Sequence, residues 1–270
     1  AMAQTLRQLL LPFTDAAGWF DWKDAPLTAA TTPLLTGLIY AILSFAIGWY
    51  MREVRHGKGF AVRQLMAAHN LFLCFLSASM AMGTAAAMIR RSLEEESATW
   101  MFCEATSTQA KGSLWFWSYV FYLSKYYELL DTALQLLKGR PPVFFLLHVY
   151  HHAFVPMIVW SWLPSAASLQ HIGLLCNAGV HTLMYYYYYR RVLGLDCWWK
   201  RYVTKIQIVQ FCISLGCCAV TLCYLFLGAE CAGKRVMLGN VLFNVTLLYQ
   251  FVGVLATNER GALTREVKRL

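Results

Sequence analysis

The chain has 270 residues, of which 59% are hydrophobic and only 14% are charged, and its mean hydropathy is +0.46. A soluble domain carries roughly 25% charged residues, so this composition excludes an ordinary soluble protein and predicts an integral membrane protein. The net charge of +9 lies in short loops between apolar segments. That distribution favours membrane orientation and phosphate contacts over a nucleic-acid-binding face.

The predicted elements are apolar segments, each close to the ~20 residues that cross a bilayer as a helix. No long linker separates them, so we expect a single integral membrane domain over residues 1–270. The fold class is therefore predicted to be an all-α polytopic membrane protein with seven transmembrane helices. These helices are expected at residues 33–50, 67–89, 113–137, 143–163, 168–189, 203–227 and 235–257.

Basic loop residues predict the orientation of these helices. Lys and Arg are concentrated in alternate loops, and the positive-inside rule places such loops in the cytosol. Residues 1–32 then form a non-cytosolic N-terminal segment, and residues 258–270 form a cytosolic tail. The basic residues concerned are Arg52, Arg55, Lys58, Arg63, Lys138, Arg140, Arg190, Arg191, Lys200, Arg201, Arg260, Arg265, Lys268 and Arg269.

Two of the nine cysteines differ from the rest in their position. No spacing is typical of a zinc site, and most cysteines lie in apolar segments, where they are expected to pack. Cys103 and Cys231 instead lie in loops assigned to the non-cytosolic side, where disulfides can persist. Each is the only cysteine in its loop, so a disulfide between them is predicted; two free thiols are the alternative.

Polar residues recur in four of the apolar segments. The first two sets have the i, i+3 and i, i+4 spacings that place side chains on one helix face. The sets, in chain order, are Lys125, Glu128 and Asp131; His148, His151 and His152; Asn177, His181 and Tyr185; and Gln207 and Gln210.

All four sets lie in the cytosolic half of their segments. At 1.5 Å per residue, His151 lies ~12 Å from the cytosolic end, and His181 lies at a similar depth. An unpaired ionisable group is costly inside a membrane, so a shared layer predicts one polar site. The alternative is a structural network between helices, above all for the first set. The remaining histidines, His56, His69 and His171, are given no role.

Four stretches, in this order and spacing, resemble the ELO family of very-long-chain fatty-acid elongases: KYYELLDT, HVYHH, NAGVHTLMYYYYY and TKIQIVQF. The resemblance covers about residues 113–211. It implies seven transmembrane helices, the last six of which enclose an acyl tunnel, in the endoplasmic reticulum membrane. It also implies the activity of a very-long-chain 3-oxoacyl-CoA synthase. This acyltransferase condenses a long-chain acyl-CoA with malonyl-CoA to give 3-ketoacyl-CoA, carbon dioxide and CoA.

The side chains available are consistent with that chemistry. Imidazole can accept and release an acyl group, and we expect His151 to be the acceptor, as the matching family position also implies. His148 and His152 would orient it or carry its proton. Asn177, His181 and Lys125 are candidates to stabilise an enolate or oxyanion.

Further residues are expected to bind substrate, and no metal or cofactor is expected. The loop cations Lys138, Arg140, Lys200 and Arg201 could hold the phosphates of CoA. Expected partners are acyl-CoA, malonyl-CoA, the bilayer and other enzymes of the elongation cycle, and not nucleic acid. The substrate-binding candidates inside the segments are Glu128, Asp131, Gln207, Gln210 and Tyr185.

Two other functions fit part of the pattern. A di-iron membrane desaturase or hydroxylase also uses histidine and carboxylate, but such a site needs about eight His ligands, and this chain has seven His in all. A seven-helix receptor or transporter is the other alternative. A receptor would be expected to bind its ligand on the opposite, non-cytosolic side.

Overall fold

The computed structural model describes residues 17–267, without the side chains of residues 201 and 261–267. Its elements are helical, as the composition predicts, and no strand occurs in the described range. The α-helices are α2 (Thr31–Trp49), α3 (Arg63–Glu94), α4 (Ser113–Glu128), α5 (Leu130–Leu137), α6 (Phe145–Trp162), α7 (Gln170–Leu193), α8 (Lys200–Phe226) and α9 (Lys234–Val267). A π-helical turn (Tyr50–Val54) extends α2.

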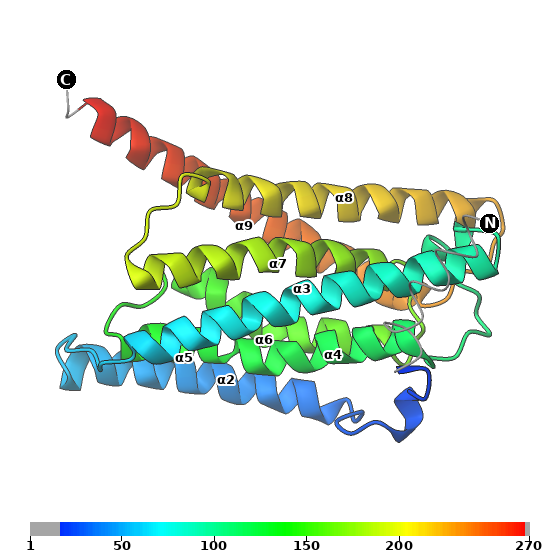
Figure 1. Ribbon diagram of the computed structural model, residues 1–270, viewed down its shortest axis with the longest axis horizontal. Coiled ribbons are helices and arrows are strands. Elements are labelled where there is room, and N and C mark those ends of the chain that lie inside the picture. The colour runs from blue at the N-terminus through cyan, green and yellow to red at the C-terminus, as the bar shows by residue number, and fades with distance from the viewer. Residues whose placement is uncertain (1–16, 268–270) are drawn as a thin grey trace.

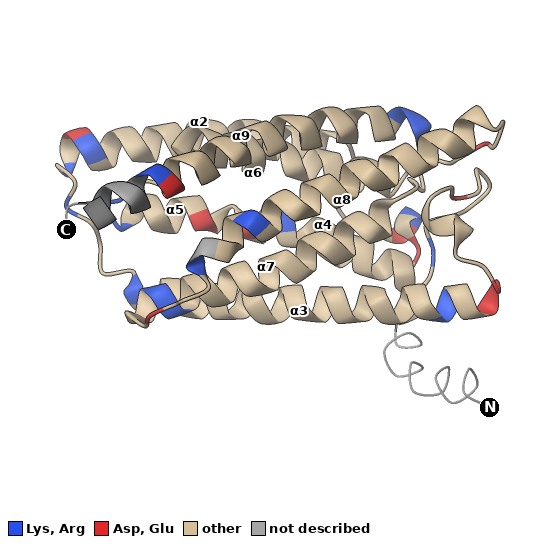
Figure 2. Ribbon diagram, turned by 90° about the horizontal axis from the view of Figure 1, so that it is seen from above, with Lys and Arg blue, Asp and Glu red and all other residues tan. Residues whose placement is uncertain are grey.

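The helices form a bundle of roughly parallel rods in which each rod runs opposite to the one before it in the chain (Figure 1). The α5–α6, α7–α8 and α2–α3 loops therefore lie at one end. The α3–α4, α6–α7 and α8–α9 loops lie at the other end. Charged residues gather near both ends of the bundle, and few occur along the middle of the helices (Figure 2).

The third predicted segment, 113–137, is not one continuous helix. It is interrupted at Leu129, whose N–H donates to the carbonyl of Tyr126 at 3.3 Å instead of continuing the i to i−4 pattern. One turn earlier, the Ser124 hydroxyl donates to the Phe121 carbonyl and to the Glu128 carboxylate. The hydrophobic pattern gives no sign of this break, because it arises from local hydrogen bonds.

Four helices are long and apolar enough to cross a membrane: Thr31–Val54, Arg63–Glu94, Tyr202–Phe226 and Lys234–Arg260. Together they indicate a multi-pass membrane protein. The other rods, formed by α4–α5, α6 and α7, carry the predicted carboxylates and histidines, which lower their hydropathy. The length and composition of the helices therefore support four of the seven predicted membrane spans.

The residues before α2 pack against α4 and the loop that precedes it. Tyr119 and Tyr122 donate their hydroxyls to the carbonyls of Pro26 and Leu27. Asp21 lies 2.9 Å from Lys111 Nζ, and this hydrogen bond lowers the pKa of the Asp21 carboxyl. Residues 17–27 therefore lie at the same end of the bundle as the α3–α4 loop. Residues 1–16 of the predicted N-terminal segment lie outside the described range.

A disulfide links two loops at this end of the bundle. It joins Cys103 of the α3–α4 loop to Cys231 of the α8–α9 loop, and the two Cα atoms are 4.7 Å apart. This is the pairing predicted from the loop charges. The other seven cysteines are free thiols.

Candidate active site

A cavity of ≈ 740 Å³ runs lengthwise through the bundle. At one end it is lined by the basic side chains Lys138, Arg140, Arg191 and Lys200. At the other end it is lined by residues of the α6–α7 turn and by the first turns of α9. Its size is within the usual range of ligand pockets, roughly 300–1,000 Å³.

The three histidines of α6 line this cavity. The ring centroids of His148 and His152 are 4.4 Å apart, and those of His151 and His152 are 5.0 Å apart. Phe243 of α9 is stacked on His151, with an interplanar angle of 9°. The shared helix face predicted from the HVYHH spacing therefore faces the cavity. His148 Nε2 and His152 Nδ1 are buried and have no hydrogen-bond partner among the residues that the structure describes.

A second group comes from α7 and α4. Asn177 and His181 of α7 line the cavity. Behind them, Lys125 Nζ lies 2.8 Å from Glu128 Oε1 and 3.4 Å from Asn177 Oδ1. His181 Nδ1 lies 3.9 Å from Glu128 Oε2.

Lys125 and Glu128 are almost fully buried and are not among the residues that line the cavity. Their predicted contacts with substrate would need direct access, which this placement does not provide. The structure instead places their charged groups next to Asn177 and His181. Lys125 and Glu128 can therefore act through those two side chains by fixing their orientation and their electrostatic surroundings.

The third group contains a residue to which the sequence assigned no role. Asp131 Oδ1 lies 2.8 Å from His69 Nε2 of α3, and Asp131 Oδ2 accepts a hydrogen bond of 2.8 Å from the Tyr185 hydroxyl. The His69 ring also stacks on Tyr127, with centroids 5.1 Å apart. All three members of the His69–Asp131–Tyr185 group line the cavity.

Depth in the membrane is the sequence signal that could have identified His69. It lies six residues after Arg63, the first residue of α3, or ~9 Å along the helix. That depth is close to the depth of His151 from the same end. Asn70 lines the same cavity, but no polar residue stands three or four positions from His69, so the spacing along α3 did not mark a polar helix face.

The glutamines of α8 also line the cavity, and Gln207 Nε2 donates to the Met184 sulfur at 3.5 Å.

The predicted cations Lys138, Arg140 and Lys200 line the basic end of the cavity. Arg191 and Tyr188, which were not predicted as site residues, line the same end. The side chain of Arg201 lies outside the described residues. The basic end can therefore receive an anionic group, and the layer of histidines lies farther inside.

Within the described part of the chain, no three His, Cys, Asp or Glu side chains are grouped so that they could hold a metal ion. The arrangement instead provides imidazole nucleophiles, nearby amide and imidazole hydrogen-bond donors, and a long cavity with a basic opening. Groups of this kind can serve in acyl transfer from a carrier that bears phosphates.

Comparison with known proteins agrees with this geometry. The sequence model of the ELO family (GNS1/SUR4 family) matches residues 25–257. Fatty acid elongase sre1 of Dictyostelium discoideum is 37% identical over 209 residues, which cover 76% of this chain and 76% of that protein. Fatty acid elongase A of the same organism is 32% identical over 73% of this chain and 70% of its own length. Very long chain fatty acid elongase 5 of Homo sapiens is 28% identical, with coverages of 75% and 65%.

Proposed function

Because this chain belongs to the ELO family of fatty acid elongases, we propose that it condenses a long-chain acyl-CoA with malonyl-CoA to give 3-ketoacyl-CoA. It is a multi-pass membrane protein of fatty acid elongation. The observation that carries the specific reaction is the position of His151, which lines the cavity between its basic opening and its far end. There an acyl thioester could reach the imidazole while the CoA phosphates stay near the basic residues.

In the proposed first half-reaction, a ring nitrogen of His151 attacks the thioester carbonyl. A C–N bond forms, the C–S bond breaks, and the CoA thiolate takes the proton that the ring loses. His148 and His152 have unpartnered nitrogens next to His151 and can carry that proton. The product is an acyl-imidazole and free CoA.

In the second half-reaction, malonyl-CoA loses carbon dioxide, and the electron pair of the broken bond forms an enolate. The enolate carbon attacks the acyl carbon, so that a C–C bond forms and the C–N bond breaks. His151 recovers its electron pair and takes up one proton. Asn177 and His181 line the cavity and can donate hydrogen bonds to the enolate or the acyl oxyanion.

We also propose seven membrane crossings, with the last six rods around an acyl tunnel, in the endoplasmic reticulum membrane. The alternation of basic loops supports a cytosolic CoA entrance and a cytosolic C-terminus. Protease treatment of sealed microsomes should remove a C-terminal epitope tag. Protection of that tag until detergent is added would contradict the orientation.

The reaction itself is tested with purified protein, a labelled malonyl-CoA and a panel of acyl-CoAs. We expect labelled 3-ketoacyl-CoA, carbon dioxide release and no requirement for added metal. The names of the relatives do not favour the desaturase alternative. That alternative predicts no use of malonyl-CoA, and it predicts loss of activity on chelation with specific recovery on adding iron.

A further inference from the structure

The far end of the cavity is bordered by the α6–α7 turn and the first residue of α7. Ser168, Leu169 and Gln170 line the cavity there, so we call them the cavity floor. Leu169 has φ 69°, a left-handed conformation that non-glycine residues rarely adopt. A backbone in that conformation persists only where its surroundings hold it there.

The neighbouring loops supply the contacts that hold the floor. The Glu104 N–H donates to Ser168 Oγ at 3.0 Å, and the Leu169 N–H donates to the Met101 carbonyl at 3.2 Å. Both bonds come from the α3–α4 loop. Ser168 donates its N–H and its hydroxyl to the Ala232 carbonyl of the α8–α9 loop, at 3.1 and 3.0 Å. The floor is therefore fixed by two loops that are distant from it in sequence.

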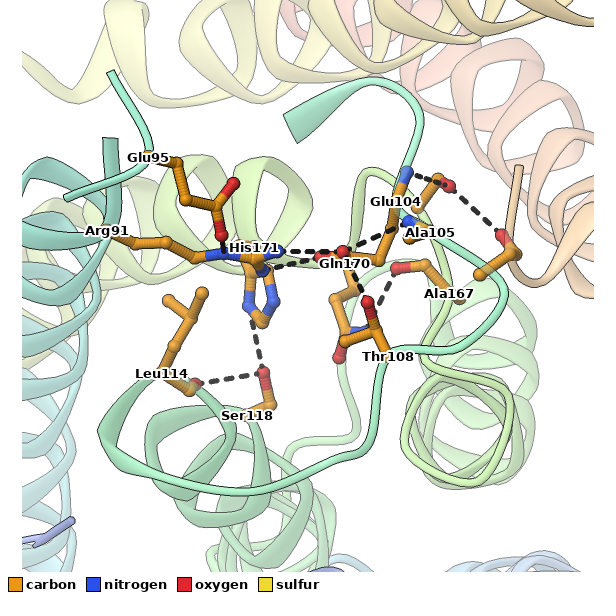
Figure 3. Close-up of polar contacts among 12 residues, drawn as sticks. Arg91, Glu95, Glu104, Ala105, Thr108, Leu114, Ser118, Ala167, Gln170 and His171 are labelled. Atoms are coloured by element: carbon orange, nitrogen blue, oxygen red, sulfur yellow. Dashed lines mark hydrogen bonds and ion pairs between the residues drawn. The ribbon is translucent and has the colours of Figure 1, made fainter. Parts of the chain in front are cut away.

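Glu104 fixes the first of these loops. Its carboxylate is buried, and Arg91 of α3 binds both carboxylate oxygens, at 2.6 and 2.8 Å (Figure 3). Glu104 Oε1 also accepts hydrogen bonds from the Ala105 N–H and the Thr108 hydroxyl, at 3.1 and 2.7 Å. Removing one partner of a buried charge pair leaves the other uncompensated. The loop conformation around Glu104 therefore depends on this carboxylate.

The same residue also connects the two loops to each other. The carbonyl of Glu104 accepts a 2.8 Å hydrogen bond from the Ala232 N–H, next to the Cys103–Cys231 disulfide. Glu104 thus joins the end of α3, the α8–α9 loop and the floor. Within the described residues it contributes to the floor from outside the cavity, since it is not one of the lining residues.

We propose that Glu104 is a positioning residue that determines the chain-length specificity of the enzyme without contacting the substrate. Through Arg91 and Ser168 it fixes the height of the cavity floor, and so it sets the longest acyl chain that the enzyme extends. This inference rests on the proposed elongase function. Its physical basis is that a closed cavity with a rigid floor rejects a chain that is too long, whereas a floor free to move can accommodate that chain.

The test compares Glu104→Gln with Glu95→Gln. Glu95 is a matched control because its exposed carboxylate accepts a hydrogen bond from the same Arg91, at 2.7 Å, and within the described part of the chain it does not bond to the floor. Each variant is assayed with a series of saturated acyl-CoAs and malonyl-CoA. The wild-type limit is the longest acyl-CoA that the wild type extends. For Glu104→Gln we expect kcat/KM for the next longer acyl-CoA, divided by kcat/KM for the shorter acyl-CoAs, to rise about tenfold over the wild-type ratio. That is the scale of one misfit methylene in an apolar pocket. Glu95→Gln should keep the wild-type profile.

Ser168→Ala provides a second test that leaves the Arg91–Glu104 pair in place and removes both hydrogen bonds of the Ser168 hydroxyl, the one from the Glu104 N–H and the one to the Ala232 carbonyl. It should shift the chain-length limit in the same direction, and it decides the question if Glu104→Gln does not fold. A uniform loss of turnover at all chain lengths, with an unchanged limit, would show that Glu104 only stabilises the fold. Such a result overturns this inference while leaving condensation intact. Absence of condensation in the wild type overturns the proposed function, and this inference with it.

Discussion

At the scale of single residues, the site is marked by buried nitrogens that lack a partner. His148 Nε2, His152 Nδ1 and His181 Nδ1 are buried without a hydrogen bond among the described residues. Most buried polar atoms in proteins have a partner, so such atoms require an explanation. All three belong to residues that line one cavity. Those of His148 and His152 lie in rings next to His151, and His181 Nδ1 lies 3.9 Å from the Glu128 carboxylate.

The first prediction concerns an acyl-enzyme on His151. Incubation with acyl-CoA in the absence of malonyl-CoA should add one acyl group to the peptide that contains residues 148–152, detected by mass spectrometry. His151→Ala should lose both the adduct and turnover. The neighbouring His148 and His152 are proposed to orient the acceptor ring or carry its proton, and not to accept the acyl group. An adduct mapped to another residue, or a variant as active as the wild type, would refute the assignment of the nucleophile.

The second prediction concerns His69. His69→Phe keeps a ring against Tyr127 but leaves Asp131 Oδ1 without its donor at 2.8 Å. Leaving a buried acceptor without its donor costs about 1–3 kcal/mol, which corresponds to roughly 5–150-fold in rate when the cost falls on the transition state. We expect kcat to fall within that range with little change in KM, and we expect His69→Gln, which keeps an N–H donor, to recover much of the loss. Equal kinetics for the two variants would rule out a positioning role.

At the scale of elements, close helix contacts fix which side chains share the cavity. The helices α2 and α6 pack together, and there Gly37 faces the backbone carbonyl of Ala153, one residue after His152. Only a residue without a Cβ permits this approach. Because His152 lies next to this contact and its ring faces Tyr40 of α2, the packing of α2 bears directly on the histidine face of α6.

The third prediction is that two glycines of α2 respond differently to the same change. A Cβ at Gly37 would collide with the backbone of Ala153, whereas a Cβ at Gly48 would meet only Leu136 Cδ2 at 3.7 Å. Overpacking costs roughly 1–3 kcal/mol, so Gly37→Ala should lower the thermal midpoint of unfolding in detergent by several degrees. Gly48→Ala should leave it unchanged or raise it, because alanine favours the helix. Equal midpoints would show that the α2–α6 contact can relax.

At the scale of the whole molecule, the two ends of the bundle have different tasks. One end has basic side chains around the cavity opening. At the other end, three loops are joined by the disulfide, by the ion pair of partly exposed Arg91 with buried Glu104, and by backbone hydrogen bonds. The end proposed to hold the acyl terminus is therefore more extensively cross-linked than the end proposed to bind CoA.

The fourth prediction concerns the disulfide. The bridge spans 128 residues, for which the chain-entropy model gives a stabilisation on the order of 4–5 kcal/mol. Cys103→Ser, Cys231→Ser and the double variant should lower the thermal midpoint by similar amounts, since each removes the same bond. Reductant should lower the midpoint of the wild type but not of the variants. Full alkylation of both thiols without reductant would show that the mature protein has no bridge.

The sequence alone determined the helical class, most of the helix ends and the face shared by the three histidines, and it predicted the cysteine pair, whereas α9 extends ten residues beyond its predicted end at residue 257. These follow from local properties: segment hydropathy, helical spacing and the alternation of loop charges. The tertiary structure decided the rest. It placed Lys125 and Glu128 behind Asn177 and His181, brought His69 to Asp131, and connected Glu104 to the cavity floor. Such relations depend on which helices and loops become neighbours, and spacing along a single helix carries no information about the side chains that another helix will present.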